Sequence, residues 1–228
     1  MPPEAPSPEK WSTLAPPADD PLPRAGDSRL EADTGGSALD TAARWISICG
    51  HPFALILLYV LVGAATRLEL RQALIAVAIV FVGGVLPMML YLASLVRRSG
   101  ANFDVSVRRE RSGAYGLGLA LGMGLLAVFA SFDAPADLLG GLACGLLLVV
   151  LASLINLRLK VSLHSAFAVW VAVGFASIAP WASAMMLLFA ALVVWSRLRL
   201  CRHTRGEVVA CVLLGAAMAL PMLFLIGS

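Results

Sequence analysis

Residues 181–227 read WASAMMLLFAALVVW, then SRLRLCRHTRGE at 196–207, then VVACVLLGAAMALPMLFLIG. The two outer runs are apolar, and they approach or reach the roughly 20 residues that a helix needs to cross about 30 Å of hydrocarbon. The joining segment holds four arginines, one histidine and one glutamate within twelve residues. Two apolar helices joined by so polar a segment predict a membrane hairpin whose connection has a specific chemical task.

Similar apolar runs continue upstream as far as Trp45, and 60% of the chain is hydrophobic against 14% charged. This composition is typical of a membrane protein. Ten-residue segments of alternating apolar and polar residues are absent from the sequence, which argues against a membrane barrel. We therefore predict an all-α integral membrane protein, a bundle of about six to seven transmembrane helices. The expected spans are 46–66, 72–96, 113–131, 138–157, 164–179, 181–197 and 207–227.

The first 44 residues differ from the rest in composition. They contain eight prolines and eight acidic residues against four basic ones. Such a segment buries too little apolar surface to offset its chain entropy, so we predict a disordered tail at 1–44 and a transmembrane domain at 45–228. A partner-binding arm is an alternative role for the tail. We do not interpret the tail as a signal peptide, because its first residues are proline-rich and acidic instead of basic and then apolar.

Three polar clusters lie in the loops that follow the second, fourth and sixth expected spans. Because each crossing changes sides, these clusters, at 102–111, 158–164 and 196–207, should meet at one end of the bundle. Spans three, five and seven begin there, and helix N-termini favour anions. The loops at this end hold eleven Arg and Lys residues against two at the other end, which favours a cytoplasmic position. We expect a phosphate-binding pocket at headgroup depth.

His203 is the candidate nucleophile or base within the segment 196–207. If the last helix begins before it, Glu207 lies one turn further on the same face and can orient the imidazole ring. A second interpretation fits the same residues. Thr204-Arg-Gly-Glu207 has the form of a capping box, in which Glu207 only starts the helix and His203 lies just outside it. The sequence leaves both interpretations open.

His164 is a second candidate, placed at the start of the fifth expected span after Lys160 and Ser162. With Ser162 as N-cap, the histidine falls in the first turn, where it could donate a proton to the leaving oxygen of a bound anion. An isolated histidine at a membrane interface is more often only an interfacial polar residue. We interpret the third histidine, His51, which precedes Pro52, as helix punctuation.

These residues resemble the motifs of the type 2 phosphatidic acid phosphatase superfamily. Ser196-Arg197, five residues, His203, three residues and an acid are similar to the third motif, with Glu207 where the family has aspartate. Val161-Ser162-Leu163-His164 is similar to the second motif, with leucine in place of glycine. The order and spacing agree with the family.

The first motif is the most divergent of the three. Asp104, six residues and Arg111-Ser112 stand where the family usually has lysine, six residues, arginine and proline. The resemblance therefore covers residues 104–207 and makes 104–228 the motif-bearing core. It is the resemblance of a divergent member of the family.

The resemblance implies metal-independent phosphotransfer through a phosphohistidine. By position, His203 would attack phosphorus, Glu207 would orient it and His164 would protonate the leaving group. The phosphoryl oxygens would be held by a set of polar side chains. They are Arg111, Ser162, Ser196 and Arg197, with Lys160 supplying the charge that Asp104 lacks and Arg108 as a further candidate.

We therefore expect a membrane phosphatase that acts on a lipid phosphate or prenyl diphosphate, without metal or other cofactor. In a bacterial cell it would lie in the plasma membrane, although the family usually works at the outer face. The alternative is a catalytically silent scaffold or transporter subunit that binds phospholipid. Nothing in the sequence suggests nucleic acid as a partner, and the oligomeric state, including a homo-oligomer, stays open.

Overall fold

A computed structural model describes residues 37–99 and 108–226, and every regular element in these ranges is helical. The chain divides at Ser37, and the helices below belong to the unit that starts at Ala38. The predicted tail up to residue 36 lies outside the described residues. The elements are α1 (Ala38–Cys49), α2 (Pro52–Ala65), α3 (Leu70–Val80), η2 (Phe81–Val85), α4 (Leu86–Ser99), α5 (Arg108–Ser131), α6 (Ala136–Ile155), α7 (Leu163–Ile178), α8 (Pro180–Arg199) and α9 (Arg205–Ile226).

The first expected span, 46–66, is wrong as a single helix. α1 begins at Ala38, before the boundary expected at residue 45, and α1 and α2 meet at a bend of 52°. The cause is local: Pro52 is the first residue of α2, and the residue before a proline disfavours the helical conformation. Gly50 lies against Val193 of α8, where a side chain would collide. The break therefore holds His51 between two helices.

The second expected span is one apolar helical segment, Leu70–Arg98, and its middle turn, η2, is π-helical. This turn contains Gly83 and Gly84, whose Cα positions lie against Leu125 of α5. A π turn widens the helix locally, and such turns are frequent at functional sites. Here the π turn lets α5 approach the α3–η2–α4 segment closely, at the level of the cavity described below.

α7 is the central helix of the bundle and packs against α8, α9, α2 and α6. Its buried residues run without interruption from Ser165 to Ala172. With 16 residues it is about 24 Å long, which is shorter than the hydrocarbon core. The expected fifth span is therefore too short to cross by itself. Because neighbouring helices surround it, its ends need not reach the membrane surface.

Close backbone contact fixes α7 against α9 and α2. A Cβ atom on Gly215 of α9 would collide with the backbone carbonyl of Ala166 in α7. On the other side, Tyr59 of α2 packs on Trp170 and Phe175, with ring centroids 4.7 and 5.9 Å apart. These aromatic contacts form the centre of the core, in which Tyr59 is 1% exposed.

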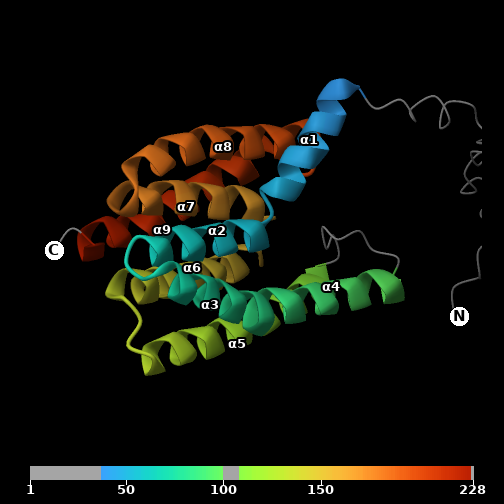
Figure 1. Ribbon diagram of the computed structural model, residues 1–228. Helices are drawn as coiled ribbons and strands as arrows, with labels where there is room; N and C mark the ends of the chain where they lie inside the picture. The colour runs from blue at the N-terminus through green and yellow to red at the C-terminus, as the bar shows by residue number, and fades with distance from the viewer. Residues whose placement is uncertain (1–36, 100–107, 227–228) are drawn as a thin grey trace, which may run out of the picture. The chain divides into compact units, whose positions relative to one another are not determined.

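The helices from α5 to α9 alternate in direction, so their connections gather at two ends (Figure 1). The expected spans 164–179 and 181–197 are separate helices joined by a tight turn, since α7 ends at Ile178 and α8 begins at Pro180. One end contains the α1–α2 bend and the loops before α7 and α9, joined by a hydrogen bond from Lys160 Nζ to the Arg202 carbonyl oxygen (3.1 Å). The opposite end contains the Arg67–Asp137 ion pair (3.0 Å).

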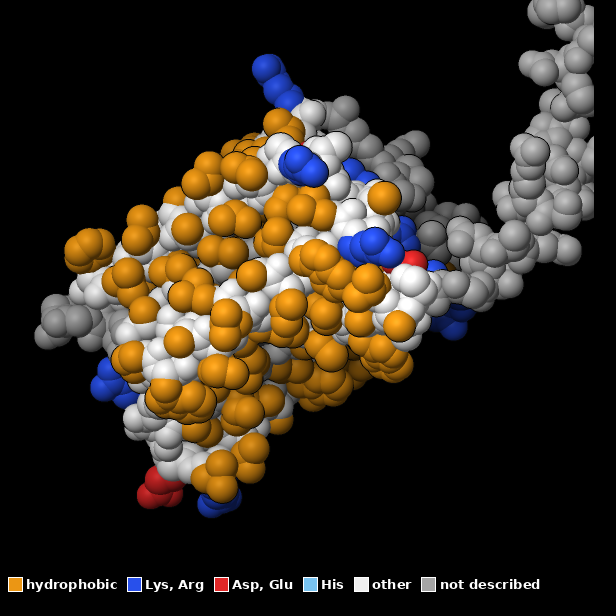
Figure 2. Space-filling model, turned by 90° about the horizontal axis from the view of Figure 1, so that it is seen from above, with side chains coloured by type: hydrophobic (Ala, Val, Ile, Leu, Met, Phe, Trp, Pro, Cys, Tyr) orange, Lys and Arg blue, Asp and Glu red, His pale blue; other side chains and the backbone are white. Residues whose placement is uncertain are grey.

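Five described helical segments are long and apolar enough to cross a membrane, and the bent α1–α2 pair would make a sixth. Figure 2 shows one side of the molecule largely covered by hydrophobic side chains, with charged residues towards its ends. Large exposed side chains on α8 include Trp181, Met185, Leu188 and Leu192. The structure is therefore that expected of a helical multi-pass membrane protein.

Candidate functional site

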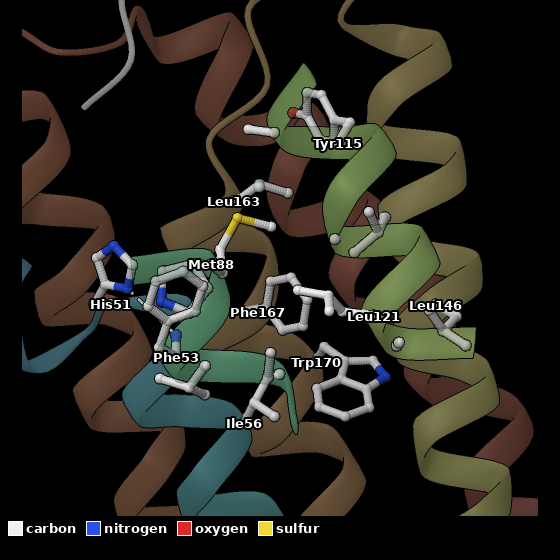
Figure 3. Close-up of a pocket in the computed structure, with 18 of the residues that line it drawn as sticks. His51, Phe53, Ile56, Met88, Tyr115, Leu121, Leu146, Leu163, Phe167 and Trp170 are labelled. Atoms are coloured by element: carbon white, nitrogen blue, oxygen red, sulfur yellow. Dashed lines mark hydrogen bonds between the residues drawn. The ribbon is translucent and has the colours of Figure 1, made fainter. Parts of the chain in front are cut away.

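An apolar cavity of about 260 Å³ lies between α2, the α3–η2–α4 segment, α5, α6 and α7 (Figure 3). Phe167 and Trp170 of α7 form part of its wall, and Gly118 and Gly122 of α5 leave room opposite them. The three histidines of the chain all line this cavity. They come from the α1–α2 bend, from α7 and from the loop before α9, and are His51, His164 and His203.

His203 precedes the N-cap of α9, and its side chain is 4% exposed. Thr204 and Glu207 form the capping box: the Thr204 amide donates to Glu207 Oε2 (2.9 Å), and the Glu207 amide donates to Thr204 Oγ1 (3.3 Å). The same Glu207 Oε2 lies 3.3 Å from His203 Nδ1. α9 begins at Arg205, after His203, so the interpretation that places both residues on one helical face is wrong, and the capping-box interpretation is confirmed. The cap fixes the carboxylate, and the fixed carboxylate stands at ion-pair distance from the imidazole ring.

His164 lies in the first turn of α7, as predicted, and Ser162 is its N-cap. Ser162 Oγ accepts from the Ser165 amide (3.5 Å) and shares a hydrogen bond with Ser165 Oγ (3.2 Å). The Ser162 amide donates to Cys211 Sγ of α9 (3.0 Å). The start of α7 is thus tied to α9, the helix that follows His203, and this contact holds the two histidine-bearing segments together.

His51 is a member of the cavity wall that the sequence interpretation missed. Its Nδ1 accepts from the Phe53 amide (3.3 Å), so the predicted role in starting α2 is confirmed. In addition its ring meets that of His164 edge to face, with centroids 5.0 Å apart and planes at 82°. The sequence pattern predicted only a role in helix punctuation for His51. It could not indicate contact with His164, because that contact depends on the bend between α1 and α2.

Two residues of the third motif are not among the residues that line the cavity. Ser196 is fully buried, and its hydroxyl donates to the Val193 carbonyl of its own helix (2.7 Å). Arg197 is 3% exposed, and its Nη1 donates to Ser47 Oγ of α1 (2.9 Å). In this structure Arg197 ties α8 to α1. The expected role of both residues in binding phosphate stays a prediction.

Three other predicted residues belong to the first motif. Asp104 lies outside the described residues, and Arg108 and Arg111 lie in the first turn of α5 with side chains that are also outside them. Lys160 is exposed, and its hydrogen bond to the Arg202 carbonyl joins the loop before α7 to the loop that carries His203. Among the described residues there is no group of three His, Cys, Asp or Glu that could hold a metal ion.

No protein-family model, curated protein or solved structure matches the chain. The phosphatase resemblance therefore rests on the three sequence motifs.

Proposed function

We propose that this protein is a membrane lipid phosphatase that acts through a phosphohistidine on His203. The observation that carries the proposal is that His203 and His164, which are far apart in the sequence, both line a single apolar cavity. A lipid phosphate has the matching division, with a charged headgroup joined to a hydrocarbon tail. The headgroup would meet the histidines while the tail occupies the space between α2, α4, α5 and α7.

The contacts of His203 support its role as nucleophile. Glu207 stands beside Nδ1, so the ring can carry its proton on that atom and present the lone pair of Nε2 to phosphorus. Attack forms a P–N bond as the P–O bond to the lipid alcohol breaks. His164 gives its proton to the departing alkoxide.

The second half of the reaction reverses these roles. A water molecule attacks phosphorus as His164 accepts its proton, the P–N bond breaks, and inorganic phosphate leaves. His203 returns to its neutral form with its proton still held beside Glu207. No bond in this sequence needs a redox step, and each proton taken up by His164 is given back in the next turnover.

Helix termini support an anion at the histidine end. α2, α7 and α9 all begin there, and an N-terminus presents unpaired amide groups and the positive end of the helix dipole. Arginine at the start of α5 would add a cation that can bind a phosphoryl group with two parallel hydrogen bonds. These features favour a phosphorylated headgroup over a neutral one.

The first experiment is phosphate release by the purified full-length protein in detergent. The substrates are phosphatidate, phosphatidylglycerol phosphate and a long prenyl diphosphate, each tested with and without EDTA. We expect EDTA-resistant release from at least one of them. His203→Ala and His164→Ala should each abolish it, while the elution volume and thermal stability stay those of the folded protein.

The matched control is a substitution at the other end of the bundle, away from the three histidines. Gln72→Ala removes the side chain whose Oε1 accepts from the Glu69 amide at the start of α3, and turnover should not change. If no lipid releases phosphate although the folded protein binds phosphatidate vesicles, the phosphatase proposal is wrong. The protein is then a phospholipid-binding scaffold or transporter subunit.

A further inference from the structure

The position of His51 is rigidly determined. It is the N-cap of α2, with Gly50 pressed against Val193 on one side and Pro52 starting the helix on the other. Its ring also packs on Phe53, with centroids 4.5 Å apart. In Figure 3 the His51 and Phe53 rings lie together at one end of the cavity. A residue needed only to cap α2 has no reason to be a histidine, because Asn, Asp and Ser are the preferred caps.

The cap contact determines how the imidazole can act. Nδ1 accepts from the Phe53 amide, so a neutral ring carries its proton on Nε2. Nε2 is then a hydrogen-bond donor, which suits a phosphoryl oxygen. The neighbouring ring, 5.0 Å away, is that of His164, the proposed proton donor. A phosphoryl group held against His164 therefore lies within reach of His51 as well.

We propose that His51 is a third histidine of the site and binds a phosphoryl oxygen of the substrate through Nε2–H. This inference rests on the proposed function, and it assigns the donor that the divergent first motif lacks. Lys160, the residue expected to supply it, is exposed and donates to the Arg202 carbonyl. His51 instead lines the cavity with His164 and His203.

The direct test is histidine modification by diethylpyrocarbonate, followed by peptide mass spectrometry. The chain has three histidines and all line the cavity, so every histidine adduct reports on the site. The probe is inorganic phosphate, the product of the proposed reaction, and sulfate-free buffer at equal ionic strength is the reference. We expect phosphate to slow the modification of His51 together with that of His164 and His203.

The outcomes separate the two proposals. If phosphate protects His164 and His203 while His51 reacts at its reference rate, the role of His51 is refuted and the phosphatase proposal stands. If phosphate protects none of the three, both proposals fail. Binding of phosphate elsewhere in the protein gives this last result, since all three rings then react as before.

A variant keeps the cap and removes the imidazole. Asn is a strong N-cap, so His51→Asn should keep the thermal stability of the folded protein. Loss of a hydrogen bond to a charged phosphoryl group should raise KM for the lipid phosphate by about 10- to 100-fold. A merely structural His51 predicts the opposite: His51→Asn would hydrolyse the substrate with an unchanged KM, and that result overturns the inference.

Discussion

A substitution at Gly118 of α5 can test whether the cavity binds the lipid tail, as the proposed function requires. Gly118 lines the cavity, and a Cβ atom there would lie 3.1 Å from Met88 Cε, the flexible end of a methionine side chain. Met adapts easily to new neighbours, so Gly118→Leu should place four carbon atoms inside the cavity without unfolding the helix. A dry cavity of about 150 Å³ holds benzene, so about 260 Å³ holds roughly ten carbon atoms.

The magnitude follows from the transfer free energy of methylene groups. Octyl phosphate has four more methylenes than butyl phosphate, and burial of each is worth about 0.8 kcal/mol from water. If the proposed tail site is correct, kcat/KM for monomeric octyl phosphate should exceed that for butyl phosphate by about 200-fold. In Gly118→Leu the new side chain occupies the space of the four additional methylenes. The ratio of kcat/KM for octyl phosphate to that for butyl phosphate should therefore fall towards one.

The assay is phosphate release from both substrates below their micelle concentrations. Butyl phosphate serves as the internal reference, because its turnover should change little and so shows that the histidines are intact. Gly124→Leu is the matched control: it changes the same helix at a position where a Cβ would meet nothing within 4 Å. If Gly118→Leu keeps the chain-length preference of the unmodified protein, the cavity does not bind the tail.

Three further changes test separate contacts. Glu207→Gln can still accept from the amide at the α9 cap but carries no charge beside the imidazole, so kcat should fall about a hundredfold or more without loss of thermal stability. Gly215→Leu would collide with the backbone of α7 and should cost at least about 1–3 kcal/mol of unfolding free energy, whereas exposed Ala217→Leu should be harmless in a detergent melt. Asp137→Asn breaks the ion pair to half-exposed Arg67 at the end away from the histidines. It should lower the free energy of unfolding by about 1 kcal/mol or less and leave kcat unchanged. An altered kcat would contradict the view that this end of the bundle takes no part in the reaction.

Much of the architecture was predictable because apolar runs and polar loops carry the information for helix direction. The alternation of helices brought the loops before α7 and α9 to one end, as the hydrogen bond between Lys160 and the Arg202 carbonyl confirms. His51-Pro52 was interpreted as helix punctuation, but the expected span 46–66 still ran across it as one helix, because a window of about 20 residues averages over a single proline. The short α7 also escaped prediction, because its burial depends on neighbours distant in sequence.

The residues of the candidate site also fall into those that the sequence could locate and those that it could not. His164 and Glu207 could be located because N-caps and capping boxes are local features, and the structure places both residues at the helix starts that these features indicate. His51 has an equally good local explanation as a cap, which concealed its contact with His164. Local rules also could not show that Arg197 turns towards Ser47 of α1, because its direction on α8 depends on where α1 packs.

α5 has fewer buried residues than the other long apolar helices: 6% of the residues in its apolar window are buried, against 39% for α8. Yet it supplies Gly118 and Gly122, two of the four described glycines that line the cavity, while the histidines belong to other segments. Substitutions on α5 can therefore alter the cavity while leaving the packing of α7 and α9 intact. Under the proposed function this would separate the choice of lipid from the chemistry, so an evolving lineage would gain new tail preferences by changes in one peripheral helix.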